Sequence, residues 1–162
     1  MKQLIWIGLL GCAHATPQAP PKSPASLAFY IGHWNCDGTS YDDKGAVEKQ
    51  WPALEIHVAA EYDNWLRVDV LDHGKQITSE LKGVDDKGVF HHVWTSSDGS
   101  YGSLTAPGWA GNQLVFDEDH AGAEKTRMTF TKLDDTHYKH KAEVDSGSGY
   151  KLGFEKTCHK VS

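Results

Sequence analysis

Short runs of alternating apolar and polar residues fill most of the chain after residue 26. Side chains alternate between the two faces of a strand, so this pattern predicts β-strands with one apolar face. Turn sequences separate the runs, for example Asp42-Asp43-Lys44-Gly45, Asp85-Asp86-Lys87-Gly88 and Ser97-Asp98-Gly99. Turns this closely spaced leave no room for crossover helices. We therefore predict an all-β fold, an antiparallel up-and-down meander of roughly nine or ten strands, preceded by a short helical turn at 27–31.

Two cysteines lie near opposite ends of this meander and suggest that it closes on itself. Trp34 and Cys36 share one face of the first strand, and Leu152 and Phe154 share a face of the last strand with Cys158. A disulfide requires Cα atoms about 4.4–6.8 Å apart. If Cys36 and Cys158 are bonded, the first and last strands are neighbours and the sheet is a barrel. The alternative is a pair of free, buried thiols.

The N-terminal segment has the pattern of an export signal. A positively charged start is followed by the apolar run 4–10, which is far shorter than the roughly 20 residues that a membrane-spanning helix needs. Leu9-Leu10-Gly11-Cys12 resembles a bacterial lipobox, which predicts that Cys12 is lipidated. Ala13-His14-Ala15 fits an ordinary signal peptidase site instead. We therefore predict a signal peptide over 1–15 and a lipid-anchored protein of the bacterial periplasm or envelope, with a secreted soluble protein as the alternative.

The residues after the signal divide into a linker and one domain. Residues 16–26 hold four of the chain's six prolines and no acidic residue, a composition typical of an extended linker. Residues 27–162 are enough for a single barrel domain. The chain has a net charge of −6 and no basic cluster, which argues against nucleic acid as a partner. The lipid anchor is then the only predicted contact with a membrane.

Four motifs in a fixed order carry a resemblance to a known family. They are GHWNCDG from Gly32 to Gly38, the turn Asp85–Gly88, APGWAGNQLVF from Ala106 to Phe116, and Cys158-His159-Lys160. The G-x-W at the start of the first strand resembles that of lipocalins and related calycin barrels. The whole set resembles a lipocalin-like family of uncharacterised bacterial envelope proteins that carry a domain of unknown function. The resemblance implies a closed barrel in which Trp34 plugs one end.

That family has no established reaction, so any chemistry must be sought in the residues themselves. The chain contains no H-E-x-x-H, C-x-x-C, G-x-S-x-G or phosphate-loop motif. Gly147-Ser148-Gly149 fits a hairpin turn, and the acidic run 117–120 lacks the spaced oxygen ligands of a calcium loop. We therefore expect a protein that is not an enzyme.

Two histidines are predicted to face the barrel interior. His92 shares a strand face with Phe90 and Trp94, and His140 shares one with Tyr138. Such histidines can bind haem iron or a transition metal. Nitrobindins, small barrels that bind haem through one histidine, also begin with a G-x-W strand. The alternative is a histidine hydrogen-bonded to a nearby tyrosine or carbonyl group, and on that interpretation the protein has no cofactor.

The aromatic residues favour a ligand site in the barrel. Trp109 lies in the glycine-rich loop 107–112, which could cap a barrel mouth. Our preferred hypothesis is an exported barrel that binds a small apolar molecule; the alternatives are a haem or metal protein and an envelope scaffold recognised through its surface. The candidate ligand-binding residues are Trp109, Trp94, Tyr138, His140 and His92, and the last two are also the candidate metal ligands.

Overall fold

The structure, a computed structural model, describes residues 25–118 and 124–161. The predicted signal peptide, Cys12 and most of the predicted linker lie outside these residues. The first element is the 3-10 helix η1 (Ala25–Tyr30), which is the helical turn that the sequence predicts. The strands of the described part are β1 (Gly32–Tyr41), β2 (Val47–Ala60), β3 (Trp65–Asp72), β4 (Lys75–Val84), β5 (Phe90–Ser96), β6 (Tyr101–Ala106), β7 (Trp109–Ala110), β8 (Gln113–Glu118), β9 (Lys125–Lys132), β10 (His137–Asp145) and β11 (Lys151–Lys160).

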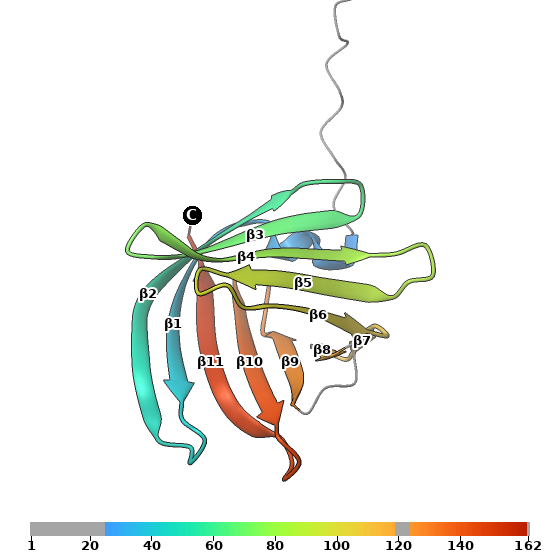
Figure 1. The fold of residues 1–162 in the computed structure, drawn as a ribbon. Coiled ribbons are helices and arrows are strands. Elements are labelled where there is room, and N and C mark those ends of the chain that lie inside the picture. Colours follow the sequence, from blue (N-terminus) through green and yellow to red (C-terminus); the bar gives the residue numbers. More distant parts are fainter. Residues whose placement is uncertain (1–24, 119–123, 162) are drawn as a thin grey trace, which may run out of the picture.

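These strands form one closed antiparallel barrel (Figure 1). Each strand pairs with its neighbour in the chain, except that the two-residue β7 lies at the edge of β8 and leaves β6 to pair with β8 directly. All of the 11 strands but β7 therefore belong to a continuous ring. The β6–β8 junction is short, with the register pairs Leu104–Glu118 and Thr105–Asp117. The predicted meander and its closure are both confirmed.

The first and last strands meet as the cysteines predict. Cys36 and Cys158 lie directly opposite each other in the β1–β11 register and form a disulfide, with their Cα atoms 4.1 Å apart. Both are fully buried, at 1% and 0% exposure. The bond closes a loop of 122 residues. In the chain-entropy description a loop of this length contributes roughly 4–5 kcal/mol to stability.

Aromatic side chains fill the end of the barrel where β1 begins. The Trp34 indole Nε1 donates a hydrogen bond to the Tyr30 carbonyl at 2.8 Å, which holds η1 against the first strand. Tyr138 packs edge-on against both rings, with centroids 4.9 Å from Trp34 and 5.1 Å from Tyr30. Leu27 of η1 is buried in the same cluster. Trp34 therefore has the plug position that the family resemblance implies.

A bulge in β2 changes which way its side chains face. Cys36 pairs with Leu54, but Gly38 pairs with Trp51, so β2 has one more residue than β1 between these pairs. The extra residue lies at Pro52-Ala53, where Ala53 adopts a left-handed backbone with φ of 60°. Because a bulge shifts the alternation by one residue, Trp51 faces inward on the same side as Leu54. Without the bulge Trp51 would face solvent.

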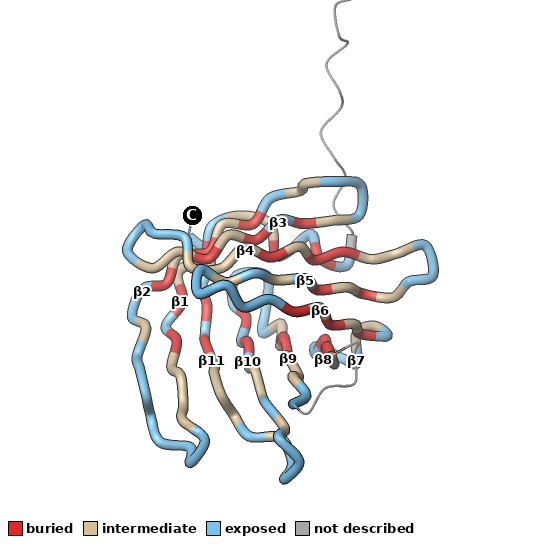
Figure 2. The backbone as a smooth tube through the Cα atoms, viewed as in Figure 1, coloured by how far each residue is buried: buried red, intermediate tan, exposed pale blue. Residues whose placement is uncertain are grey.

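Burial follows the barrel interior and the plugged end (Figure 2). The buried positions lie along the inner faces of the strands, whereas the tips of the β1–β2 and β10–β11 hairpins are exposed. No helix among residues 25–118 and 124–161 is long and apolar enough to span a membrane.

Candidate functional site

A cavity of about 540 Å3 occupies the barrel beyond the aromatic plug. Its apolar wall includes Leu54 of β2, Met128 of β9 and Phe154 of β11. Ser96, Ser97, Asp98 and Ser100 of the β5–β6 turn line it as well, together with Ser40 near the end of β1. Gly38 leaves room for the Phe154 ring in this wall, because a Cβ at position 38 would lie 3.0 Å from that ring. Small-molecule sites are typically cavities of about 300–1,000 Å3 with mostly apolar walls and a few polar groups.

One wall of the interior carries a buried cluster of charged and polar side chains. Glu80 and Lys82 lie on the inner face of β4, where Lys82 pairs in register with His92 of β5. Lys82 forms an ion pair with the Glu80 carboxylate, and the same Oε2 accepts a hydrogen bond from His92 Nε2 at 3.0 Å. The three residues are 8%, 2% and 1% exposed, respectively. A buried ion pair with an added hydrogen bond is the arrangement that makes such burial tolerable.

The protonation state of this cluster follows from its burial. Burial lowers the pKa of His92 well below its ordinary value, and the charges of Lys82 and Lys156 lower it further. The imidazole is therefore neutral at neutral pH. Because Nε2–H donates to Glu80, Nδ1 is the unprotonated nitrogen. That atom is buried and has no hydrogen-bond partner among the described residues.

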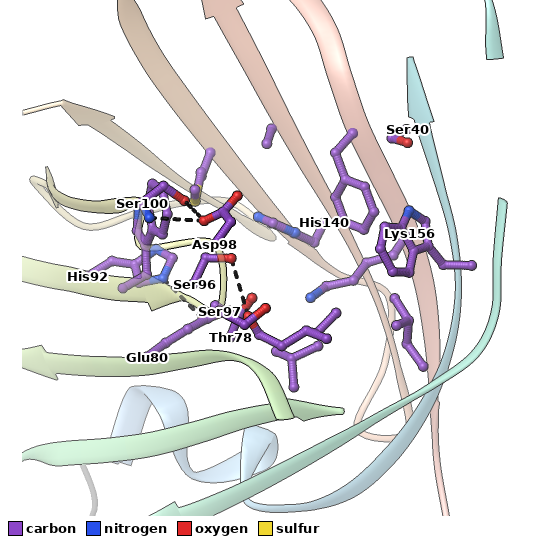
Figure 3. Close-up of a pocket in the computed structure, with 18 residues that line it drawn as sticks. Ser40, Thr78, Glu80, His92, Ser96, Ser97, Asp98, Ser100, His140 and Lys156 are labelled. Carbon is purple, nitrogen blue, oxygen red and sulfur yellow. Dashed lines mark hydrogen bonds and ion pairs between the residues drawn. The ribbon is translucent and has the colours of Figure 1, made fainter. Parts of the chain in front are cut away.

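The facing wall places His140 next to Lys156. The two residues are register partners on β10 and β11, and both are 6% exposed. Figure 3 shows both side chains reaching into the cavity, with Glu80 and His92 on the opposite side. The His140 ring stacks on Phe130 at 4.4 Å between centroids. Burial lowers the pKa of His140 well below its ordinary value, with Lys156 and then Lys82 adding to the effect.

Several polar atoms around the cavity lack partners within the described part of the chain. They include both ring nitrogens of His140 and the indole nitrogens of Trp51 and Trp94. Lys156 also makes no hydrogen bond or ion pair with a described residue, and burial lowers its pKa to about 8. Buried polar groups in folded proteins are nearly always hydrogen-bonded. The unpartnered groups around this cavity are therefore available to hydrogen-bond with water or with a molecule in the cavity.

The structure brings together three of the five sequence-predicted ligand residues. His92, Trp94 and His140 line the cavity. Tyr138 instead belongs to the plug, and its hydroxyl lies 3.4 Å from that of Tyr30. Trp109 also lies at the plugged end, where its ring meets Phe29 edge-on at 6.0 Å. The loop 107–112 therefore covers the closed end and not the cavity.

Three buried charged residues, Glu80, Lys82 and Lys156, are not among the residues predicted from the sequence. A signal was present for Lys156, because it follows the same alternation as Phe154 and Cys158 on the inner face of β11. As for metals, the described residues hold no group of three or more histidine, cysteine or acidic side chains that could bind an ion. The acidic run 117–120 begins within β8 and continues outside the described residues.

Together these features define a closed antiparallel β-barrel with a plugged end and an interior cavity whose mostly apolar wall carries several polar groups. No protein-family model matches the chain, and no curated protein sequence matches it. Membership of the lipocalin-like envelope family therefore stays a prediction.

Among solved structures, the chain is similar to the crystal structure of Rv2717c from M. tuberculosis. The match covers 87% of this chain and 100% of that chain, with a TM-score of 0.62 and 12% sequence identity. At this identity the likeness establishes the fold alone.

Proposed function

We propose that this protein is an exported, lipocalin-like barrel that binds a small, largely apolar molecule in the cavity beyond the plug. The cavity of about 540 Å3 carries the proposal. Its wall combines apolar side chains such as Leu54 and Phe154 with unpartnered polar atoms of Trp94 and His140, and this combination is typical of small-molecule sites. The role we propose is binding and not catalysis.

Native mass spectrometry of protein purified from its own host tests this function directly. The proposal expects a co-purifying small molecule. Ala142 lines the cavity, so Ala142→Leu should fill part of it and lower the occupancy. Ala59 is an exposed alanine on β2, and Ala59→Leu is the matched control that should leave occupancy unchanged. A repeatedly empty cavity would contradict ligand binding and favour the envelope scaffold instead.

Export is supported by the buried Cys36–Cys158 disulfide, since such bonds persist mainly in oxidising compartments. The signal pattern at the N-terminus points the same way. We propose that Cys12 is lipidated, which would anchor the barrel to a membrane. Mass spectrometry of the mature protein separates the alternatives: a lipid-modified Cys12 at the N-terminus supports anchoring, and an unmodified chain that starts after Ala15 supports secretion.

Haem bound through His140 is a second candidate function. It is favoured by the two buried His140 nitrogens, which have no partner among the described residues, and by the neutral state of the ring. A metal-binding histidine ordinarily donates its other N–H to a carboxylate or carbonyl, and His140 shows no such partner in the described part. Haem titration decides the matter: a Soret shift that disappears in His140→Phe supports haem binding, and no shift argues against it.

A further inference from the structure

Lys156 is a buried cation without a counter-ion among the described residues. Its side chain is 6% exposed and faces the cavity (Figure 3), and its ammonium lies 5.9 Å from the centre of the Phe154 ring, yet it makes no hydrogen bond or ion pair with a described residue. Glu80, the one buried carboxylate among the described residues, is already bound by Lys82 and His92. Burial alone accounts for the lowered pKa of Lys156, about 8, at which the amine is still mostly protonated at neutral pH. An unpaired buried charge carries a desolvation cost, which a counter-ion offsets.

The other ionisable groups of the cavity leave one positive charge uncompensated. Burial lowers the pKa of Lys82 as well, but the Glu80 carboxylate in direct contact with its ammonium favours the charged form, so the two charges offset each other. His92 and His140 are neutral because burial lowers the pKa of each ring. Asp98 lines the cavity from the exposed β5–β6 turn, where the Ser100 amide and hydroxyl both donate to its carboxylate. Asp98 is therefore already hydrogen-bonded and lies in solvent, and it does not pair with Lys156.

We infer that the molecule held in the cavity is an amphipathic monoanion whose carboxylate binds Lys156, with its apolar body along Leu54, Met128 and Phe154. This inference rests on the proposed ligand-binding function and adds the chemical class of the ligand. An apolar molecule with one carboxylate matches both the apolar wall and the single uncompensated charge.

The position of His140 favours a group with two acceptor oxygens. Directly paired residues on neighbouring antiparallel strands have Cβ atoms about 4.5–5.5 Å apart. The two side chains therefore leave the wall from adjacent positions, and in our inference the Lys156 ammonium and one N–H of the neutral His140 ring donate to the two oxygens of one carboxylate. A neutral alcohol or hydrocarbon would leave the ammonium buried and unpaired, so the cavity should discriminate against it.

A matched pair of ligands, decanoate and decanol, tests this inference by isothermal titration calorimetry. The two share an apolar chain and differ in the carboxylate. Hydrogen bonds to charged groups predict that wild-type protein binds decanoate roughly 10- to 100-fold more tightly than decanol. In Lys156→Met this preference should disappear, with decanol binding retained. Lys156→Gln, which keeps a hydrogen-bond donor but no charge, should lose most of it.

Lys139→Met is the control, because Lys139 is an exposed lysine of β10 beside His140 and its removal makes the same change in net charge. This variant should keep the wild-type preference. If decanol and decanoate bind equally well to wild type, the anion inference is wrong and the binding function stands. If neither ligand binds and no other apolar molecule does, the binding function fails together with the inference.

Discussion

Replacing Lys156 with methionine should stabilise the unliganded protein. Methionine has a similar length and no charge, so it fills the same space along Phe154 without a desolvated ammonium. Burial lowers the pKa of Lys156 from its ordinary value of 10.5 to about 8. Since each pKa unit corresponds to about 1.4 kcal/mol, carrying the charged lysine costs the folded protein about 3 kcal/mol relative to the unfolded chain. The ammonium faces the cavity, so water there makes this value an upper limit.

The pH dependence follows from the direction of this shift. Well below pH 8 both states are protonated, and the full cost is present. Between about pH 8 and 10.5 the folded protein has released the proton while the unfolded chain still binds it. Stability from this group therefore rises with pH through that window, and the cost vanishes above it. Burial also lowers the pKa of Lys82, with Lys156 as the second cause, so removing Lys156 relieves Lys82 as well.

Urea denaturation of wild type, Lys156→Met and Lys139→Met measures this effect under non-reducing conditions. Near pH 7, Lys156→Met should be more stable than wild type by about 3 kcal/mol, and the difference should fall to about 1 kcal/mol at pH 10 and vanish at higher pH. The exposed control should stay within about 0.5 kcal/mol of wild type. A Lys156→Met variant that is less stable than wild type near pH 7, or a difference independent of pH, would refute the idea that Lys156 is an uncompensated buried cation.

Three further predictions concern the barrel frame. Cys36→Ala combined with Cys158→Ala should lower the free energy of unfolding by about 2–5 kcal/mol, measured by denaturant titration against wild type with and without reductant. Ala53→Gly should raise it by about 0.5–1 kcal/mol, because glycine adopts the left-handed backbone at the bulge without the steric cost; a destabilised variant would contradict this. Gly102→Ala should lower the free energy of unfolding by about 1–3 kcal/mol and change the indole fluorescence, because its Cβ would lie 2.7 Å from Trp94 Nε1. An unchanged spectrum and stability would show that Trp94 can move freely.

The barrel could be predicted because its determinants are local. Alternating polarity defines the strands, and the turns between them exclude crossover connections. Closure of the barrel needs one long-range contact, between the first and last strands. Cys36 and Cys158 each share a strand face with apolar residues, and this placement predicts that contact. Their pairing in the β1–β11 register then confirms the closure.

The candidate site was only partly predictable, because alternation gives the face of a side chain and not its depth. Tyr138 and His140 share the inner face of β10, yet a strand advances about 3.3 Å per residue, so they lie roughly 7 Å apart along the barrel. That distance separates the plug from the cavity. Trp51 shows a different limit: its inward direction depends on the bulge at Ala53, and an alanine gives no sequence signal for a left-handed backbone.

The buried charges connect the disulfide with the proposed function. An uncompensated Lys156 costs the empty barrel about 3 kcal/mol, and the Cys36–Cys158 bond contributes up to roughly 4–5 kcal/mol. A barrel closed by this bond can therefore keep a charged group in its cavity and remain folded without ligand. An anion that neutralises Lys156 would recover part of that cost as binding free energy. Removal of the disulfide should thus make folding more dependent on the ligand. In the Cys36→Ala/Cys158→Ala variant, decanoate should therefore raise the melting temperature more than decanol does.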